Sequence, residues 1–83
     1  MDPIGAAVKD FILAEFLVGA HPSELTETTP LISSGVVDSL ATVRLVAFLE
    51  DQYGIAVAPH EASIDYLDTI DQIVSLVRSK QAS

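Results

Sequence analysis

Cysteine and tryptophan are absent from this chain of 83 residues, and only four residues are lysine or arginine. The lack of cysteine excludes disulfide frameworks and thiolate metal sites, so any thiol must come from an added group. No apolar run approaches the roughly 20 residues that a membrane span requires. The opening Met1-Asp2-Pro3 lacks the basic segment of a signal peptide. We therefore expect a cytoplasmic protein that does not associate with membranes.

The charge of the protein is strongly one-sided. Twelve acidic residues against four basic ones give a net charge of -8, and no base lies between Lys9 and Arg44. Six acids lie between Arg44 and Arg78, namely Glu50, Asp51, Glu61, Asp65, Asp68 and Asp71. Such a surface repels nucleic acid and attracts partner proteins with basic patches. The alternative interpretation is that the acidity only keeps a small protein soluble.

The length predicts a single domain, residues 1–83, with a modest core. Helical periodicity predicts a first helix over Pro3–Val18, with Asp2 as its N-cap and Gly19 as its C-cap. A long connector over Ala20–Val37 follows, and connectors of this length are often functional. We expect its apolar residues to pack onto the helices, and Gly35 to make a tight bend.

Two further segments complete the predicted fold. A helix over Ser39–Tyr53 begins after Asp38 as its N-cap and ends at Gly54. A short turn over Ala62–Leu67 precedes a final helix, where Thr69 and Gln72 fit a capping box. The prediction is an all-α fold, a small bundle of three main helices plus one short helix.

The sequence contains no recognisable catalytic or metal motif. Gly-rich phosphate loops and metal-ligand spacings are absent. His21 and His60 are isolated in polar loops, and we interpret them as surface residues. Ser39 has no histidine near it in sequence, and the adjacent acids Glu50 and Asp51 on an exposed helix face lack the cleft that acid–base chemistry requires. We expect a protein that is not an enzyme and that binds no metal.

The stretch Leu31–Leu40, which ends in Asp38-Ser39-Leu40, and the following helix through Ile55 resemble the phosphopantetheine-attachment region of acyl carrier proteins. The resemblance implies that a phosphopantetheinyl transferase esterifies Ser39 with 4'-phosphopantetheine from coenzyme A. The arm then holds a cargo as a thioester. A helix N-terminus also favours the phosphodiester charge. The alternative interpretation of Asp38 or Ser39 is that of a helix cap alone.

The same resemblance implies that the second helix is the partner surface. Leu40, Val43 and Ala47 match its apolar contact points, and Glu50 and Asp51 match its acidic ones. Two positions that are often acidic in fatty-acid carriers are Ala41 and Arg44 here. We expect both to weaken the negative field of the docking face, which favours a dedicated partner in a specialised pathway.

The cargo stays open between an acyl and an aminoacyl unit. Val36-Val37 replace the Gly-Gly that is common among peptidyl carriers, whereas the run Gly35–Leu40 resembles stand-alone carriers loaded with an amino acid by an adenylating ligase. We expect a free-standing monomer that serves a loading ligase or acyltransferase and downstream synthases of a fatty-acid-like, polyketide-like or specialised pathway. The alternative from another class is a small helical interaction domain that is never modified.

Overall fold

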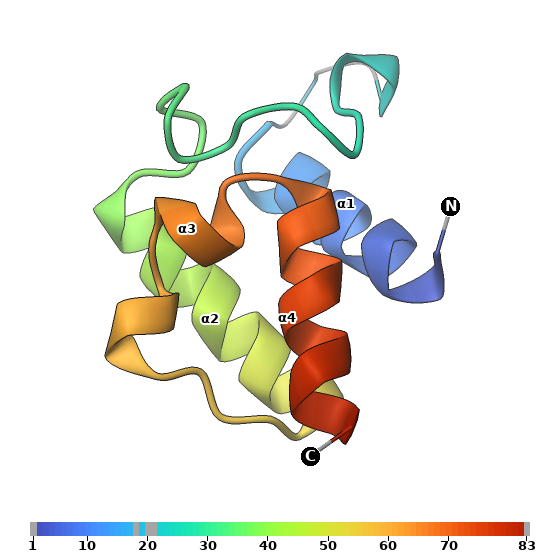
Figure 1. Cartoon of the computed structure of the whole chain (residues 1–83). Helices are drawn as coiled ribbons and strands as arrows, with labels where there is room; N and C mark the ends of the chain where they lie inside the picture. The colour runs from blue at the N-terminus through green and yellow to red at the C-terminus, as the bar shows by residue number, and fades with distance from the viewer. Residues whose placement is uncertain (1, 18, 20–21, 83) are drawn as a thin grey trace.

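The computed structural model describes residues 2–17, 19 and 22–82. Its α-helices are α1 (Pro3–Glu15), α2 (Ser39–Tyr53), α3 (Ile64–Leu67) and α4 (Ile70–Ala82), with 3-10 turns η1 (Pro22–Glu24) and η2 (Pro59–Glu61) (Figure 1). The predicted all-α fold of three main helices and one short helix is confirmed. None of the helices in the described part of the protein is long and apolar enough to cross a membrane.

Helix α1 begins as predicted but ends one turn early. The Oδ1 atom of Asp2 accepts a hydrogen bond from the N–H of Ile4 at 2.9 Å, which caps the helix. The N–H groups of Phe16 and Leu17 both donate to the C=O of Ile12, at 2.9 and 3.2 Å. Sharing of one carbonyl ends the helical ladder, and the Phe16 ring packs edge-on against Phe11. The predicted end at Val18 with Gly19 as C-cap was therefore wrong; Val18 itself lies outside the described residues.

The other predicted helix ends are confirmed. Gly54 has a φ of 63° and closes α2 in the left-handed conformation. At the start of α4, the N–H of Thr69 donates to Oε1 of Gln72, and the N–H of Gln72 donates to Oγ1 of Thr69, both at 3.1 Å. These bonds form the capping box that the sequence predicted.

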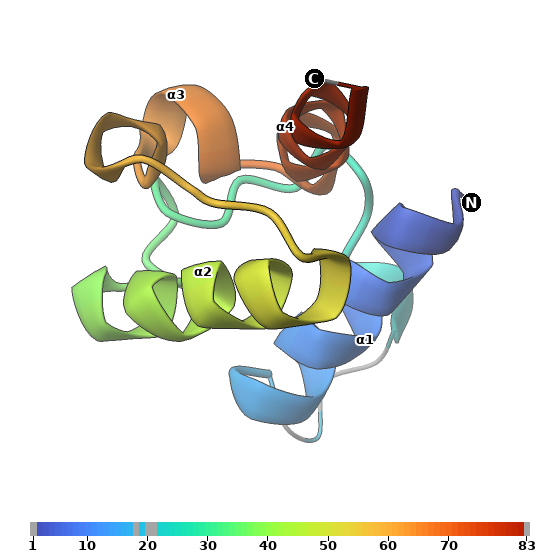
Figure 2. The ribbon, with the colours of Figure 1, turned by 90° about the horizontal axis from the view of Figure 1, so that it is seen from below.

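The core lies between α1, α2 and α4, and the connector closes it at one end. Seen from below, α2 lies on one side of the bundle and α3 and α4 lie on the other (Figure 2). Leu25, Leu31 and Val37 of the connector are buried, so this segment belongs to the core, as predicted. The buried apolar side chains are those of Val8, Ile12, Leu25, Leu31, Val37, Ala41, Leu45, Leu49, Leu67, Ile70, Ile73, Leu76 and Val77. The connector is thus packed against the core up to the residue before Asp38, the N-cap of α2.

Candidate functional site

Ser39 is the first residue of α2, and its side chain is exposed. The cap of this helix is Asp38, whose Oδ1 atom accepts a hydrogen bond from the N–H of Ala41 at 2.8 Å. Neither the Ser39 hydroxyl nor the N–H groups of Ser39 and Leu40 bond to any described residue. Capping therefore falls to Asp38 alone, and the Ser39 hydroxyl stays available at a helix end that favours negative charge.

Two other serines lie in the connector close to Ser39 in sequence. The hydroxyl of Ser33 donates to Oδ2 of Asp68 at 2.9 Å. The hydroxyl of Ser34 donates to the C=O of Pro30 at 2.7 Å. Both hydroxyls hold the connector in place, whereas the Ser39 hydroxyl has no hydrogen-bond partner among the described residues.

A shallow hollow of about 460 Å³ lies beside Ser39. Its lining comes from the connector, the first turns of α2 and the segment before α3: Ile32, Val37, Asp38, Ser39, Thr42, Val43, Ala62 and Ser63. The Thr42 hydroxyl donates to the C=O of Asp38 at 2.8 Å, and the Ser63 hydroxyl donates to the C=O of His60 at 3.1 Å. The hollow therefore combines apolar walls with two hydroxyl groups whose oxygens can still accept hydrogen bonds.

The outer face of α2 carries most of the predicted partner residues. Leu40 is 73% exposed and Val43 is 64% exposed, while Ala47 and Asp51 are exposed on the same side of the helix. Ile64 and Tyr66 of α3 are also exposed, which the sequence did not indicate. Because α3 has only four residues, no periodic pattern could have shown which way these side chains face.

We expected Glu50 to lie beside Asp51 on an exposed face of the helix, and the structure places Glu50 differently. Its side chain is half-buried, and its Oε2 atom accepts a hydrogen bond from the N–H of Val57 at 3.0 Å. Glu50 thus fixes the segment that follows α2, whereas Asp51 remains exposed. The expectation that both carboxylates are exposed was therefore wrong for Glu50, whose carboxylate also serves the fold.

Ala41 also lies elsewhere than expected. Ala41 is 7% exposed and belongs to the core cluster. Its side chain therefore faces the interior, and the lack of an acid at this position does not change the charge of the docking face. The expectation that Ala41 weakens the field of the outer face was wrong for this reason.

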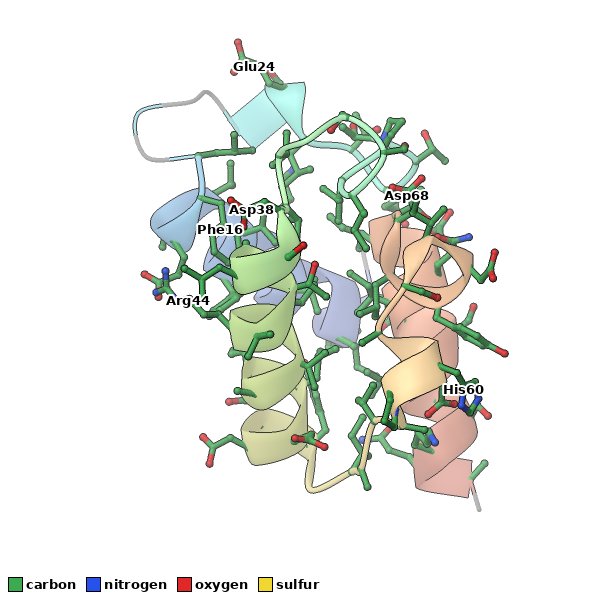
Figure 3. The ribbon with its side chains drawn as sticks, turned by 90° about the vertical axis from the view of Figure 1, so that its left-hand side faces the viewer. Phe16, Glu24, Asp38, Arg44, His60 and Asp68 are labelled. Carbon is green, nitrogen blue, oxygen red and sulfur yellow. The ribbon has the colours of Figure 1, made fainter. Side chains whose placement is uncertain are left out.

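Arg44 lies at the edge between α2 and α1. Its guanidinium pairs with the Glu15 carboxylate and lies 5.5 Å from the centre of the Phe16 ring (Figure 3). The stacked rings of Phe11 and Phe48, 4.3 Å apart, join the same two helices. The positive charge of Arg44 is therefore balanced by an acid from another helix and not by acidic neighbours on its own helix.

The described histidine takes no part in this region. His60 is exposed, and its ring lies edge-on to Tyr66 at 6.1 Å between centres. Figure 3 shows it well separated from Asp38, the neighbour of Ser39. His21 lies outside the described residues. Within residues 2–17, 19 and 22–82, no three potential metal ligands gather at one place.

A comparison with protein families identifies a family to which most of the chain is similar. The family model described as "Phosphopantetheine attachment site" matches residues 12–77, from the last turn of α1 to the second half of α4. The matched span includes Ser39, the connector before it and all of α2.

Proposed function

Because the chain belongs to the phosphopantetheine-attachment family, whose members bind 4'-phosphopantetheine covalently on a serine, we propose that Ser39 is the attachment residue of a carrier domain. The observation that carries this assignment is the uncommitted, exposed hydroxyl of Ser39 at the start of α2. The neighbouring serines at 33 and 34 already donate their hydroxyl hydrogens to the protein. Asp38 and Leu40 complete the motif around it.

The residues at the start of α2 suit this modification chemically. The Ser39 oxygen forms the new bond to phosphorus, the pyrophosphate bond of coenzyme A breaks, 3',5'-ADP leaves, and the serine proton goes to the transferase. The unpaired N–H groups of Ser39 and Leu40 then face a phosphodiester charge that a helix N-terminus stabilises. When attached, the group supplies the thiol that this cysteine-free protein lacks and holds a carboxylic acid as a thioester.

The outer face of α2 is our proposed docking surface, formed by Leu40, Val43, Ala47 and Asp51 with Arg44 at its edge. Exposed large apolar side chains on a small acidic protein are typical of an interaction site. Three of the four basic residues form ion pairs within the protein: Arg44 with Glu15, Arg78 with Asp2 and Lys80 with Glu61. The net negative charge therefore favours a transferase or biosynthetic enzyme that presents basic side chains around an apolar contact.

We propose a short cargo of an acyl or aminoacyl kind in a specialised pathway. The core side chains fill the interior of the bundle, and the hollow beside Ser39 is shallow and bears the hydroxyls of Thr42 and Ser63. A short acyl or aminoacyl unit, the latter loaded by an adenylating ligase, suits a shallow hollow with apolar walls and two hydroxyls better than a long alkyl group. Arg44, where fatty-acid carriers often have an acid, supports a dedicated partner.

Intact mass measurement tests the attachment. The protein is incubated with coenzyme A and a broad-specificity phosphopantetheinyl transferase. Wild type gains the mass of one phosphopantetheinyl group, Ser39→Ala gains none, and the control variants Ser33→Ala and Ser34→Ala are still modified. An unchanged wild-type mass would contradict the proposal and favour an interaction domain that is never modified. A modified Ser39→Ala would contradict the assignment of Ser39 and place the attachment on another residue.

A further inference from the structure

Asp68, which lies between α3 and α4, binds the connector through its side-chain and backbone oxygens. Its Oδ1 atom accepts hydrogen bonds from the N–H groups of Ile32 at 2.9 Å and Ser33 at 2.8 Å. Its Oδ2 atom accepts the Ser33 hydroxyl at 2.9 Å, and its backbone C=O accepts the N–H of Leu31 at 2.6 Å. Figure 3 shows Asp68 at the end of the bundle where the connector passes. Four hydrogen bonds thus join three consecutive connector residues to one residue.

The segment that Asp68 binds leads directly to the attachment motif. Between Leu31 and Val37 the backbone forms a closed loop, because the N–H of Val37 donates to the C=O of Leu31 at 3.0 Å. Within this loop, Gly35 has a φ of 86° and its N–H donates to the C=O of Ile32 at 3.1 Å. Ser39 follows two residues after Val37. The place from which α2 begins is therefore tied to Asp68.

We propose that Asp68 is a positioning residue for the modification of Ser39: its carboxylate fixes the Leu31–Val37 loop that presents the Ser39 hydroxyl to the modifying enzyme. This inference rests on the function proposed above. The loop belongs to no strand or helix, so its N–H groups lack the hydrogen bonds that regular structure provides. The bonds to Asp68 satisfy three of these groups and fix the conformation of the loop. Small displacements of a reacting group lower transfer rates strongly, which makes the position of this loop relevant to the reaction.

The electrostatics of the carboxyl group agree with this role. The N–H and hydroxyl groups of Ser33, together with the N–H of Ile32, hold the pKa of Asp68 below its usual value despite partial burial. The carboxyl group is therefore ionised at neutral pH. Hydrogen bonds to an ionised acceptor are stronger than those to a neutral one.

The test compares the variants Asp68→Ala, Asp68→Asn and Ser33→Ala with Asp65→Ala. Asp65 is an exposed carboxylate on α3 and serves as the matched control. Loading by a broad-specificity phosphopantetheinyl transferase with coenzyme A gives kcat/KM for each variant. Hydrogen exchange of the Ile32 and Ser33 amides reports the loop, and urea denaturation reports the whole fold.

We expect Asp68→Ala to lower kcat/KM about tenfold, with faster exchange at the Ile32 and Ser33 amides and a cooperative unfolding transition retained. Asp68→Asn keeps an oxygen acceptor for both N–H groups and should restore most of the rate. Ser33→Ala loses only the hydroxyl bond and should lose less than Asp68→Ala. Asp65→Ala should load like wild type.

Two results would overturn the proposal. One is a wild-type loading rate in Asp68→Ala although its Ile32 and Ser33 amides exchange freely. The other is a rate loss that follows global stability across all the variants, with no separate change in the loop amides. Absence of any modification on the wild type would instead refute the proposed function itself, so the two failures are distinguishable.

Discussion

The two faces of α2 have similar apolar content but different surroundings. The inner face presents Ala41, Leu45 and Leu49 to the core, and all three are buried. The outer face presents Leu40, Val43 and Ala47, and all three are exposed. Hydrophobicity alone therefore does not distinguish the face that stabilises the fold from the face left for a partner. The distinction comes from the elements that pack against each side of the helix, and the following experiments test it.

The largest expected effect on stability comes from shortening a buried side chain on the inner face. Leu49 is fully buried, so Leu49→Ala should lower the free energy of unfolding by about 2–4 kcal/mol through lost burial and a cavity. Val43→Ala, on the outer face, should change it by at most about 0.5 kcal/mol. Urea denaturation of both variants measures the difference. A larger loss for Val43→Ala would show that the two faces have been assigned the wrong way round.

The sequence predicted those parts of the fold that depend on local chemistry. Asp2, Asp38 and the Thr69–Gln72 box were identified as caps because each bonds to an N–H within three residues of itself. The end of α1 was wrong because it depends on how Phe16 packs. The pattern of apolar residues does not predict the contact between the Phe16 and Phe11 rings that accompanies the end of the helix.

The candidate site was predicted in part for the same reason. The Asp38-Ser39-Leu40 motif indicated the serine, and the family resemblance indicated Leu40, Val43 and Ala47 as apolar residues of the partner surface. The partners of Glu50 and Arg44 are 7 and 29 residues away, so their roles within the fold gave no local signal. The Asp68 bonds to the connector span 35 and 36 residues and were equally invisible.

The second expected effect concerns recognition by the outer face. Asp51→Lys should slow loading by a transferase with a basic docking patch severalfold, because attraction at that position becomes repulsion. The loss should be greater at low salt than at high salt, since salt screens exposed charges. Asp10→Lys is the matched control, because Asp10 is exposed on α1 and the change in net charge is the same. Equal slowing by both variants would mean that net charge matters and the outer face does not.

A smaller effect is expected at Arg44, on the border between the outer face and α1. A double-mutant cycle with Arg44→Gln and Glu15→Gln should give a coupling free energy of about 0.2–1 kcal/mol, as is usual for exposed ion pairs. The contact of the Arg44 guanidinium with the Phe16 ring also stabilises the protein, and Glu15→Gln leaves this contribution to the free energy of unfolding unchanged. Denaturation of the four proteins measures the cycle. Zero coupling would mean that the pair with Glu15 does not hold Arg44, whose guanidinium would then be available to a partner.

The smallest expected effect is in the acid sensitivity of the fold, and it concerns carboxylates that lie outside α2. The pKa of Asp68 is lowered by its bonds to Ser33 and Ile32, and that of Glu61 is lowered by its bond to Lys80. A carboxyl group with a folded-state pKa below its unfolded value stabilises the protein above the unfolded pKa. That stabilisation is lost as the pH falls through the folded pKa. Wild type should therefore lose stability as the pH falls below about 4.

Asp68→Asn should weaken this dependence, because the amide does not titrate. Thermal unfolding of wild type and Asp68→Asn between neutral pH and about pH 3 measures the slopes. Glu61 keeps part of the acid sensitivity in every variant, so the Asp68→Asn slope should be reduced and not flat. A slope for Asp68→Asn equal to that of wild type would show that the bonds from Ser33 and Ile32 do not stabilise the ionised form of Asp68.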